Sequence, residues 1–208
     1  MKHRATRELF DYWNTLRGNR AVPERAEIDL AAIRGLIADM FMLDVDAAHR
    51  FPFILSGTRV NALACAEQRD RSFLDLWSTQ EARNIAASLL TVMDAACPVI
   101  ANAVATPDGF TAHEFDILLL PLGRRGQNRP RILGLVACAT PPSWLGLLPV
   151  KNFTLQSLQR VDAAAAPREF NPPPLFAPAP VPPQTQPSRQ AGKSVRHLRV
   201  FDGGREFP

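Results

Sequence analysis

The side chains in this sequence that could carry out acid–base chemistry cluster on one predicted strand. Apolar and polar residues alternate over 111–122, which places His113 on one face and Glu114 and Asp116 on the other. A histidine and a carboxylate form a common general acid–base pair when both reach one cavity. Because the alternation sends His113 and Asp116 to opposite faces, we expect the two carboxylates to be solvent-exposed and His113 to be a core or pocket-edge residue.

Other patterns of catalytic or metal-binding residues are absent from the sequence. There is no Gly-x-Ser-x-Gly turn, no Walker-type glycine loop and no histidine at metal-ligand spacing from carboxylates. Cys65, Cys97 and Cys138 form no Cys-x-x-Cys motif and are expected to be free thiols in a reducing compartment. We therefore expect no enzyme, no metal and no cofactor. The alternative is a small-molecule enzyme or carrier on a cone-like α+β fold, in which His113 and Asp116 would have to meet.

The composition divides the chain after Val161 and Asp162. Residues 163–208 hold 10 of the 19 prolines and a net charge of +3, whereas residues 1–162 are nearly neutral. Proline at that density prevents helix formation and strand pairing. We predict a folded domain over 1–162, a disordered proline-rich linker over 163–192 and a short basic and apolar motif over 193–208. Since the basic excess belongs to the tail, we expect no nucleic-acid binding.

The cellular location is predicted from two segments. The first residues are charged and lead into no apolar run of the signal-peptide type. Residues 132–150 contain no charge, but Pro141 and Pro142 would break a membrane helix in their middle. We expect a buried strand followed by a loop, and a cytoplasmic protein without a membrane span.

The residues that could do chemistry must be positioned by a small set of elements. Leu9, Trp13 and Leu16 share one face of a predicted helix that Thr6 caps and Gly18 ends. Periodicity predicts further helices over 59–67, 73–77 and 79–96 and a short one from Asp29, and strands over 41–45, 51–55, 99–105, 111–122 and 131–139. This order indicates an α+β fold, a five-stranded antiparallel sheet with helices on one face. Residues 144–148 and 155–161 are expected to pack on the domain with no assigned type.

The order of two strands, a helical cassette and three strands resembles a PAS domain. Val60-Asn61-Ala62-Leu63 and Arg71-Ser72-Phe73-Leu74-Asp75-Leu76-Trp77 are similar to the segment in which PAS chains carry an asparagine and a Gly-Arg-x-Phe/Leu turn. Asp70 stands where many of those chains have glycine, and aspartate tolerates the left-handed conformation that the turn needs. Residues 8–13 and 142–146 further resemble small stand-alone bacterial PAS-like proteins.

This resemblance implies a non-catalytic sensory or regulatory module for signal transduction, which binds a small, mostly apolar ligand between sheet and cassette or binds none. The aromatic candidates for the ligand site are Phe53, Phe73, Trp77 and Phe115, and the polar candidates are Arg59, Asn61 and His113. The alternative reading of the aromatic set is plain core. Haem-binding PAS domains commonly use a histidine of the long cassette helix, and residues 79–96 contain none. The flavin-binding Asn-Cys-Arg-Phe motif is not formed around Cys65.

Two segments are predicted to bind a protein partner. PAS domains often dimerise through a helix that precedes the sheet, so Leu9, Trp13 and Leu16 are candidates for a homodimer face. The alternative is that this helix covers its own sheet. In the tail, Val195, Leu198 and Phe201 recur every three residues and could dock on a partner or on the domain as a helical turn or as an added strand.

Overall fold

The computed structural model describes residues 1–123 and 131–162. Its helices are α1 (Arg4–Arg17), α2 (Thr58–Leu63) and α3 (Thr79–Asp94), with short 3-10 helices η1 (Arg25–Glu27), η2 (Arg34–Asp39) and η3 (Phe73–Leu76). Its strands are β1 (Met40–Leu43), β2 (Phe53–Ser56), β3 (Val99–Ala105), β4 (His113–Leu122), β5 (Arg131–Ala137) and β6 (Phe153–Arg160). The predicted linker and tail lie outside the described residues. None of the described helices is long and apolar enough to cross a membrane.

The strands form one antiparallel sheet in the order β2-β1-β5-β4-β3-β6. The α+β class and the five expected strands are confirmed, and β6 adds a sixth strand in a segment to which we assigned no type. Phe153 and Leu155 alternate with polar residues, but Ser157 and Leu158 reverse the order, and a register shift opposite Asn102 and Ala103 interrupts the period of two. The sequence pattern of this strand was therefore faint.

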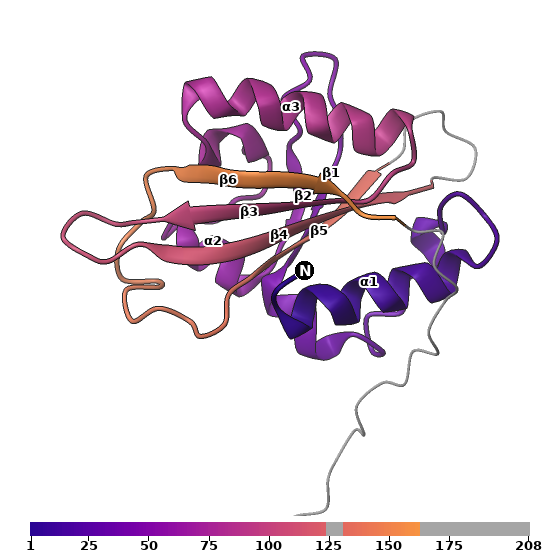
Figure 1. Ribbon diagram of the computed structural model, residues 1–208, viewed down its shortest axis with the longest axis horizontal. Helices are drawn as coiled ribbons and strands as arrows, with labels where there is room; N and C mark the ends of the chain where they lie inside the picture. The colour runs from indigo at the N-terminus through magenta and orange to yellow at the C-terminus, as the bar shows by residue number, and fades with distance from the viewer. Residues whose placement is uncertain (124–130, 163–208) are drawn as a thin grey trace, which may run out of the picture. The chain divides into compact units, whose positions relative to one another are not determined.

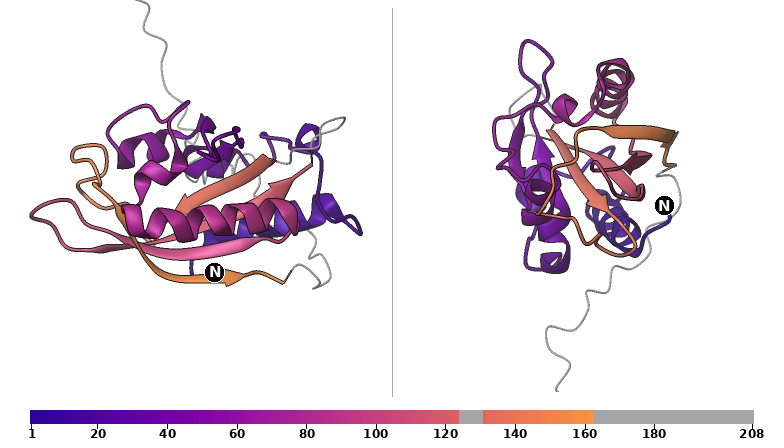
Figure 2. Two further views of the ribbon diagram at one scale, coloured as in Figure 1. Left: turned by 90° about the horizontal axis from the view of Figure 1, so that it is seen from above. Right: turned by 90° about the vertical axis from the view of Figure 1, so that its left-hand side faces the viewer.

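Helices cover both faces of the sheet, so β4 is buried on both sides (Figures 1 and 2). On one face, Ile85 and Leu89 of α3 lie in a single apolar cluster with Phe115 of β4. On the other face, Leu9 and Trp13 of α1 lie in a second cluster, which includes the alternate β4 residues Leu118, Leu120 and Leu122. We call these the cassette face and the α1 face.

Helix α1 packs on its own sheet. Leu9 and Trp13 are fully buried, Leu16 is half-buried, and the Trp13 Nε1–H donates to the carbonyl of Pro121 over 2.8 Å. The expected cap at Thr6 is wrong: the helix begins at Arg4 with His3 at its N-cap position, and Thr6 lies in the first turn, where its hydroxyl donates to the His3 carbonyl. The apolar face that we considered for a homodimer is thus largely occupied within the chain.

Local turns follow the sequence with one exception. Gly18 and Asp70 have φ values of 53° and 64°, as the two turns were expected to require, and Ser78 caps α3 by accepting from the N–H of Glu81. The helix expected to begin at Asp29 is wrong. The Asp29 carboxylate accepts from the N–H of Ala31, which closes a tight turn, and the nearby 3-10 helices are η1 and η2.

Candidate functional site

The four aromatic candidates meet on the cassette face, as the sequence predicted. Phe53 and Phe73 have ring centroids 5.7 Å apart, Phe73 and Trp77 are 6.1 Å apart, and all four side chains are buried. Phe41 and Phe153 fill the space between them, with Phe153 at 5.5 Å from both Trp77 and Phe115. These edge-to-face and stacked contacts are those of a packed aromatic core. None of these rings lines either of the two cavities described below.

His113 lies at the rim of this aromatic core and holds a loop. Its Nε2 is 2.8 Å from the carbonyl oxygen of Thr140, and its ring meets Phe115 and Trp144 edge-on. The hydrogen bond joins the start of β4 to the chain after β5. His113 therefore has a structural role at the edge of the aromatic core, and it lines neither of the two cavities.

The two remaining polar candidates lie away from the aromatic core. Asn61 accepts from the hydroxyl of Ser56 and the N–H of Gln68, and donates to Glu67, so it closes the turn after α2. Arg59 forms an ion pair with Asp39 at the end of η2. Hence the seven predicted ligand-binding residues do not form one site.

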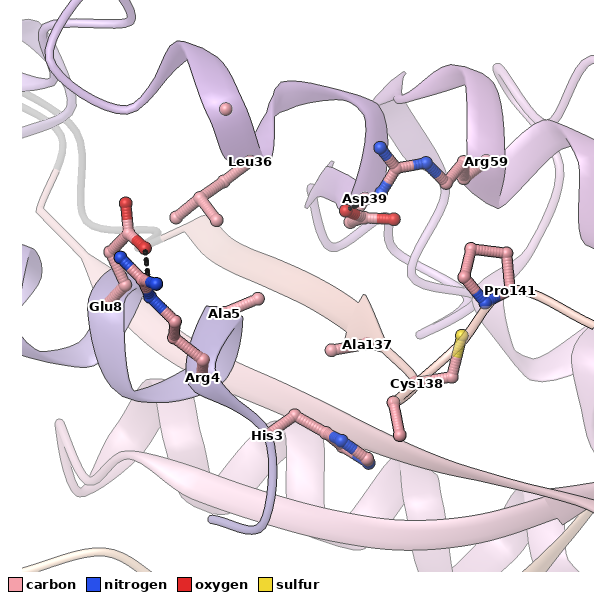
Figure 3. Close-up of a pocket in the computed structure, with 12 residues that line it drawn as sticks. His3, Arg4, Ala5, Glu8, Leu36, Asp39, Arg59, Ala137, Cys138 and Pro141 are labelled. Carbon is pink, nitrogen blue, oxygen red and sulfur yellow. Dashed lines mark hydrogen bonds and ion pairs between the residues drawn. The ribbon is translucent and has the colours of Figure 1, made fainter. Parts of the chain in front are cut away.

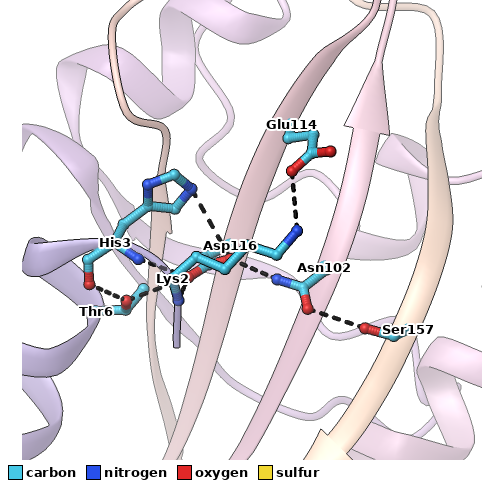
Figure 4. A network of polar contacts seen from close by, with 7 residues as sticks. All are labelled: Lys2, His3, Thr6, Asn102, Glu114, Asp116 and Ser157. Atoms are coloured by element: carbon cyan, nitrogen blue, oxygen red, sulfur yellow. Dashed lines mark hydrogen bonds and ion pairs between the residues drawn. The ribbon is translucent and has the colours of Figure 1, made fainter.

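Asp116 corrects a sequence-based expectation. We expected it to be exposed beside Glu114, but its side chain is fully buried on the α1 face, and only Glu114 is exposed. Its Oδ2 accepts from the N–H groups of Lys2 and His3 over 2.7 and 3.1 Å and lies 3.4 Å from the Thr6 hydroxyl (Figure 4). Its Oδ1 accepts from the amide of Asn102. The expectation failed because it assumed one solvated face, whereas β4 has none.

The histidine near Asp116 is His3 and not His113. His3 Nε2 lies 3.9 Å from Asp116 Oδ1, is buried and finds no hydrogen-bond partner among residues 1–123 and 131–162. His113 joins the aromatic core on the cassette face, whereas Asp116 faces α1. The geometry needed for an enzyme built on His113 and Asp116 is therefore not met.

A cavity of about 360 Å³ opens beside His3 on the α1 face (Figure 3). We call it the α1-side cavity. It is formed by the first two turns of α1, by η2, by α2 and by the end of β5. Its lining consists of His3, Arg4, Ala5, Glu8, Gly35, Leu36, Asp39, Arg59, Ala137, Cys138, Ala139 and Pro141. Of the predicted ligand residues, only Arg59 belongs to it.

The charged side chains of this cavity form two ion pairs. Asp39 and Arg59 form a close ion pair, while Arg4 Nε and Glu8 Oε2 are 4.0 Å apart. Burial raises the pKa of the Asp39 carboxyl, and the Arg59 guanidinium offsets part of that rise. Burial also raises the pKa of the Cys138 thiol, with the Asp39 charge adding to the effect. Cys138 is thus a protonated thiol at neutral pH and a poor nucleophile.

A second hollow of about 540 Å³ lies near the C-terminal end of α1, beside Arg17, Cys97 and Arg160. None of its polar side chains is buried. In the described residues, no group of three His, Cys, Asp or Glu side chains could hold a metal ion. The α1-side cavity is therefore the better candidate for a binding site.

Sequence reasoning missed most of this cavity. His3, Asp39 and Cys138 lie on three segments that are far apart in the chain, and no spacing rule connects them. One signal was available for Asp116. It shares a strand face with Leu118, Leu120 and Leu122, and a carboxylate on such an apolar face indicates a buried partner.

Comparison with known proteins adds one finding. A family model described as a PAS domain matches residues 1–137, which is about two thirds of the chain. The match covers α1, the cassette and strands β1 to β5. No curated protein matches the chain.

Proposed function

The chain belongs to the PAS domain family, and from this premise we propose that it is a non-catalytic regulatory module whose ligand site is the α1-side cavity. PAS domains are sensory or regulatory modules in general, so the class of function follows from the family. The site within the module is our proposal. It supplements the apolar site between sheet and cassette, which stays a prediction for Phe53, Phe73, Trp77, His113 and Phe115.

The observation that carries this proposal is the composition of the cavity wall. Arg4 and Glu8 come from α1, Asp39 from η2 and Arg59 from α2, so a bound molecule would contact elements that are separate in the chain. A ligand that bridges them would hold α1 more tightly against the sheet, because it binds the docked arrangement better than the released one. The fraction of molecules with α1 docked on the sheet would then rise when the ligand binds.

The anchoring of α1 supports such a readout. Apart from its apolar face, the helix is held at its start by the hydrogen bonds of Lys2, His3 and Thr6 to Asp116. His3 belongs to both this network and the cavity wall. A change in the cavity therefore acts directly on the residues that anchor the helix.

The test is native mass spectrometry of the full chain purified from its own host. We expect a bound small molecule in the wild type, and its loss in Ala5→Leu, whose larger side chain fills the cavity from α1 (Figure 3). Ala31→Leu is the matched control, since Ala31 is exposed and does not line the cavity. Retention of the molecule by Ala5→Leu would assign it to another site. A wild type without any bound molecule would refute the proposal.

We also propose a protein partner, since PAS domains commonly mediate protein interactions. Val195, Leu198 and Phe201 lie outside the described residues, and their role as a partner-binding motif stays a prediction. Deleting residues 190–208 should leave the melting temperature nearly unchanged and abolish capture of the partner in pull-downs. Recovery of the same proteins by full-length and truncated chains would contradict it.

A further inference from the structure

The charges in the α1-side cavity sum to zero when histidine is neutral. Arg4 and Arg59 balance Glu8 and Asp39. A ligand with one net charge would therefore bring an unpaired charge into a partly buried site, which is costly in a medium of low dielectric constant. The chemistry of the wall favours a ligand that carries both signs.

The two pairs differ in burial. The side chains of Asp39 and its ion-pair partner Arg59 are 12% and 48% exposed. Arg4, by contrast, is 87% exposed, and its 4.0 Å contact with Glu8 is loose. Because exposed ion pairs contribute little, the Asp39–Arg59 pair is the part of the wall able to recognise charge.

This pair has capacity left for a ligand. Arg59 donates to Asp39 through Nη1, and within the described residues its remaining N–H groups have no hydrogen-bond partner. Burial disfavours the Asp39 carboxylate more than Arg59 favours it, as the raised pKa of Asp39 shows. A second cation beside Asp39 would compensate for that burial.

The wall next to this pair is apolar. Ala5, Leu36 and Ala137 lie between the Asp39–Arg59 pair and the Arg4–Glu8 pair (Figure 3). The small side chains of Ala5 and Ala137 leave room beside Leu36 for an aliphatic group of a few carbon atoms. The cavity thus combines one charged end with an apolar middle.

We propose that the α1-side cavity binds an aliphatic α-amino acid, with its ammonium group on Asp39, its carboxylate on Arg59 and its side chain against Ala5, Leu36 and Ala137. The charges of Asp39, Arg59 and the ligand's two groups alternate in sign. Each ligand group therefore lies against a side chain of opposite charge, and the Asp39–Arg59 ion pair stays formed. This inference rests on the proposed function, because it names the ligand class of the same cavity.

The test compares three probes that share a 3-methylbutyl group, using isothermal titration calorimetry on the full chain. L-leucine carries both charges, 4-methylpentanoate only the carboxylate and 3-methylbutylamine only the ammonium group. We expect L-leucine to bind at least about ten-fold more tightly than either of the others, the difference that a lost charge-assisted contact produces. Equal binding of a singly charged probe, or no binding of L-leucine, overturns the proposal.

Variants locate the binding. Arg59→Gln and Asp39→Asn should each weaken L-leucine binding by about ten-fold or more. Arg20→Gln is the control, because it removes an exposed ion pair with Glu27 that does not line the cavity. Unchanged affinity in both cavity variants would refute the site.

If Ala5→Leu releases a copurified molecule while L-leucine does not bind, the amino-acid class is wrong and the proposed function stands. If Ala5→Leu has no effect on that molecule, the proposed function fails as well.

Discussion

The buried carboxylate of Asp116 on β4 accepts a 2.7 Å hydrogen bond from the backbone N–H of Lys2, 114 positions earlier in the chain. The N–H of His3 and the amide of Asn102 donate to the same carboxylate (Figure 4). A strand in the middle of the sheet thereby supplies the negative charge at the start of α1, whose own first turn contains no acidic residue. Asp116 therefore anchors the start of α1, while Leu9 and Trp13 hold the apolar face of the helix against the sheet.

We expect Asp116→Ala to destabilise the protein by about 3 kcal/mol, because several buried donors lose their acceptor. Hydrogen exchange of the α1 amides should become faster than that of β4. Urea unfolding and amide exchange measure the two effects. Glu114→Ala removes an exposed ion pair with Lys2 and should change stability by less than about 1 kcal/mol. Normal protection of α1 in Asp116→Ala would contradict the anchoring role.

Asp39 should make stability depend on pH. Its pKa in the folded state is raised above the ordinary 3.8, mainly by burial, so the folded state binds the proton more tightly than the unfolded state. The resulting stabilisation is complete below about pH 3.8 and is lost as the pH rises through the folded-state pKa. Asp39→Asn mimics the protonated side chain and should melt at a higher temperature than the wild type at pH 7. That difference should shrink towards pH 3.

The same substitution separates stability from binding. Asp39→Asn should bind L-leucine more weakly while it melts at a higher temperature at neutral pH. Thermal melts at pH 3, 5 and 7 with and without the ligand check both effects. An Asp39→Asn variant that is less stable than the wild type at pH 7 would show that the Arg59 pair outweighs burial.

Trp13→Ala should cost about 4 kcal/mol, because it empties a fully buried site and removes the hydrogen bond to Pro121. This variant therefore tests the core of the α1 face and not a dimer interface. Chemical denaturation with tryptophan fluorescence of the remaining residues measures the loss.

A test of the predicted homodimer requires substitutions at half-buried positions of α1, where the fold is retained. Phe10 and Leu16 are only partly covered in the described chain, so Phe10→Ala with Leu16→Ala should retain the fold. If α1 mediates a dimer, light scattering should give twice the monomer mass for the wild type and a lower mass for the double variant. A monomeric wild type would end this prediction.

Gly134→Ala should destabilise the sheet by about 2 kcal/mol, because the added methyl group would overlap the ring of Phe41 on the neighbouring strand. Gly35→Ala is the matched control, since a methyl group there meets no atom within 4 Å. Urea unfolding of the two variants gives the comparison. Equal stability of both would mean that β1 shifts to accommodate the methyl group.

The elements with strong local signals could be predicted from sequence alone. The face of Leu9 and Trp13, the Ser78 cap, the turn at Asp70 and the strand over 99–105 all depend on neighbours within a few residues, and the chain realises them as expected. The burial of the aromatic residues was also predictable, because strand alternation and helical periodicity indicate which side chains point inward.

Tertiary structure decided that the α1 face has the α1-side cavity and that the aromatic rings of the cassette face pack against one another. Phe53, Phe73 and Phe115 are apolar and inward in any such fold, but only three-dimensional packing determines whether Phe41 and Phe153 fill the space between them. The burial of Asp116 likewise depends on α1 covering the second face, and the meeting of His3, Asp39 and Arg59 depends on how η2 and α2 close over β5. Sequence periodicity reports one element at a time, whereas burial and charge pairing are properties of surfaces that meet across the chain.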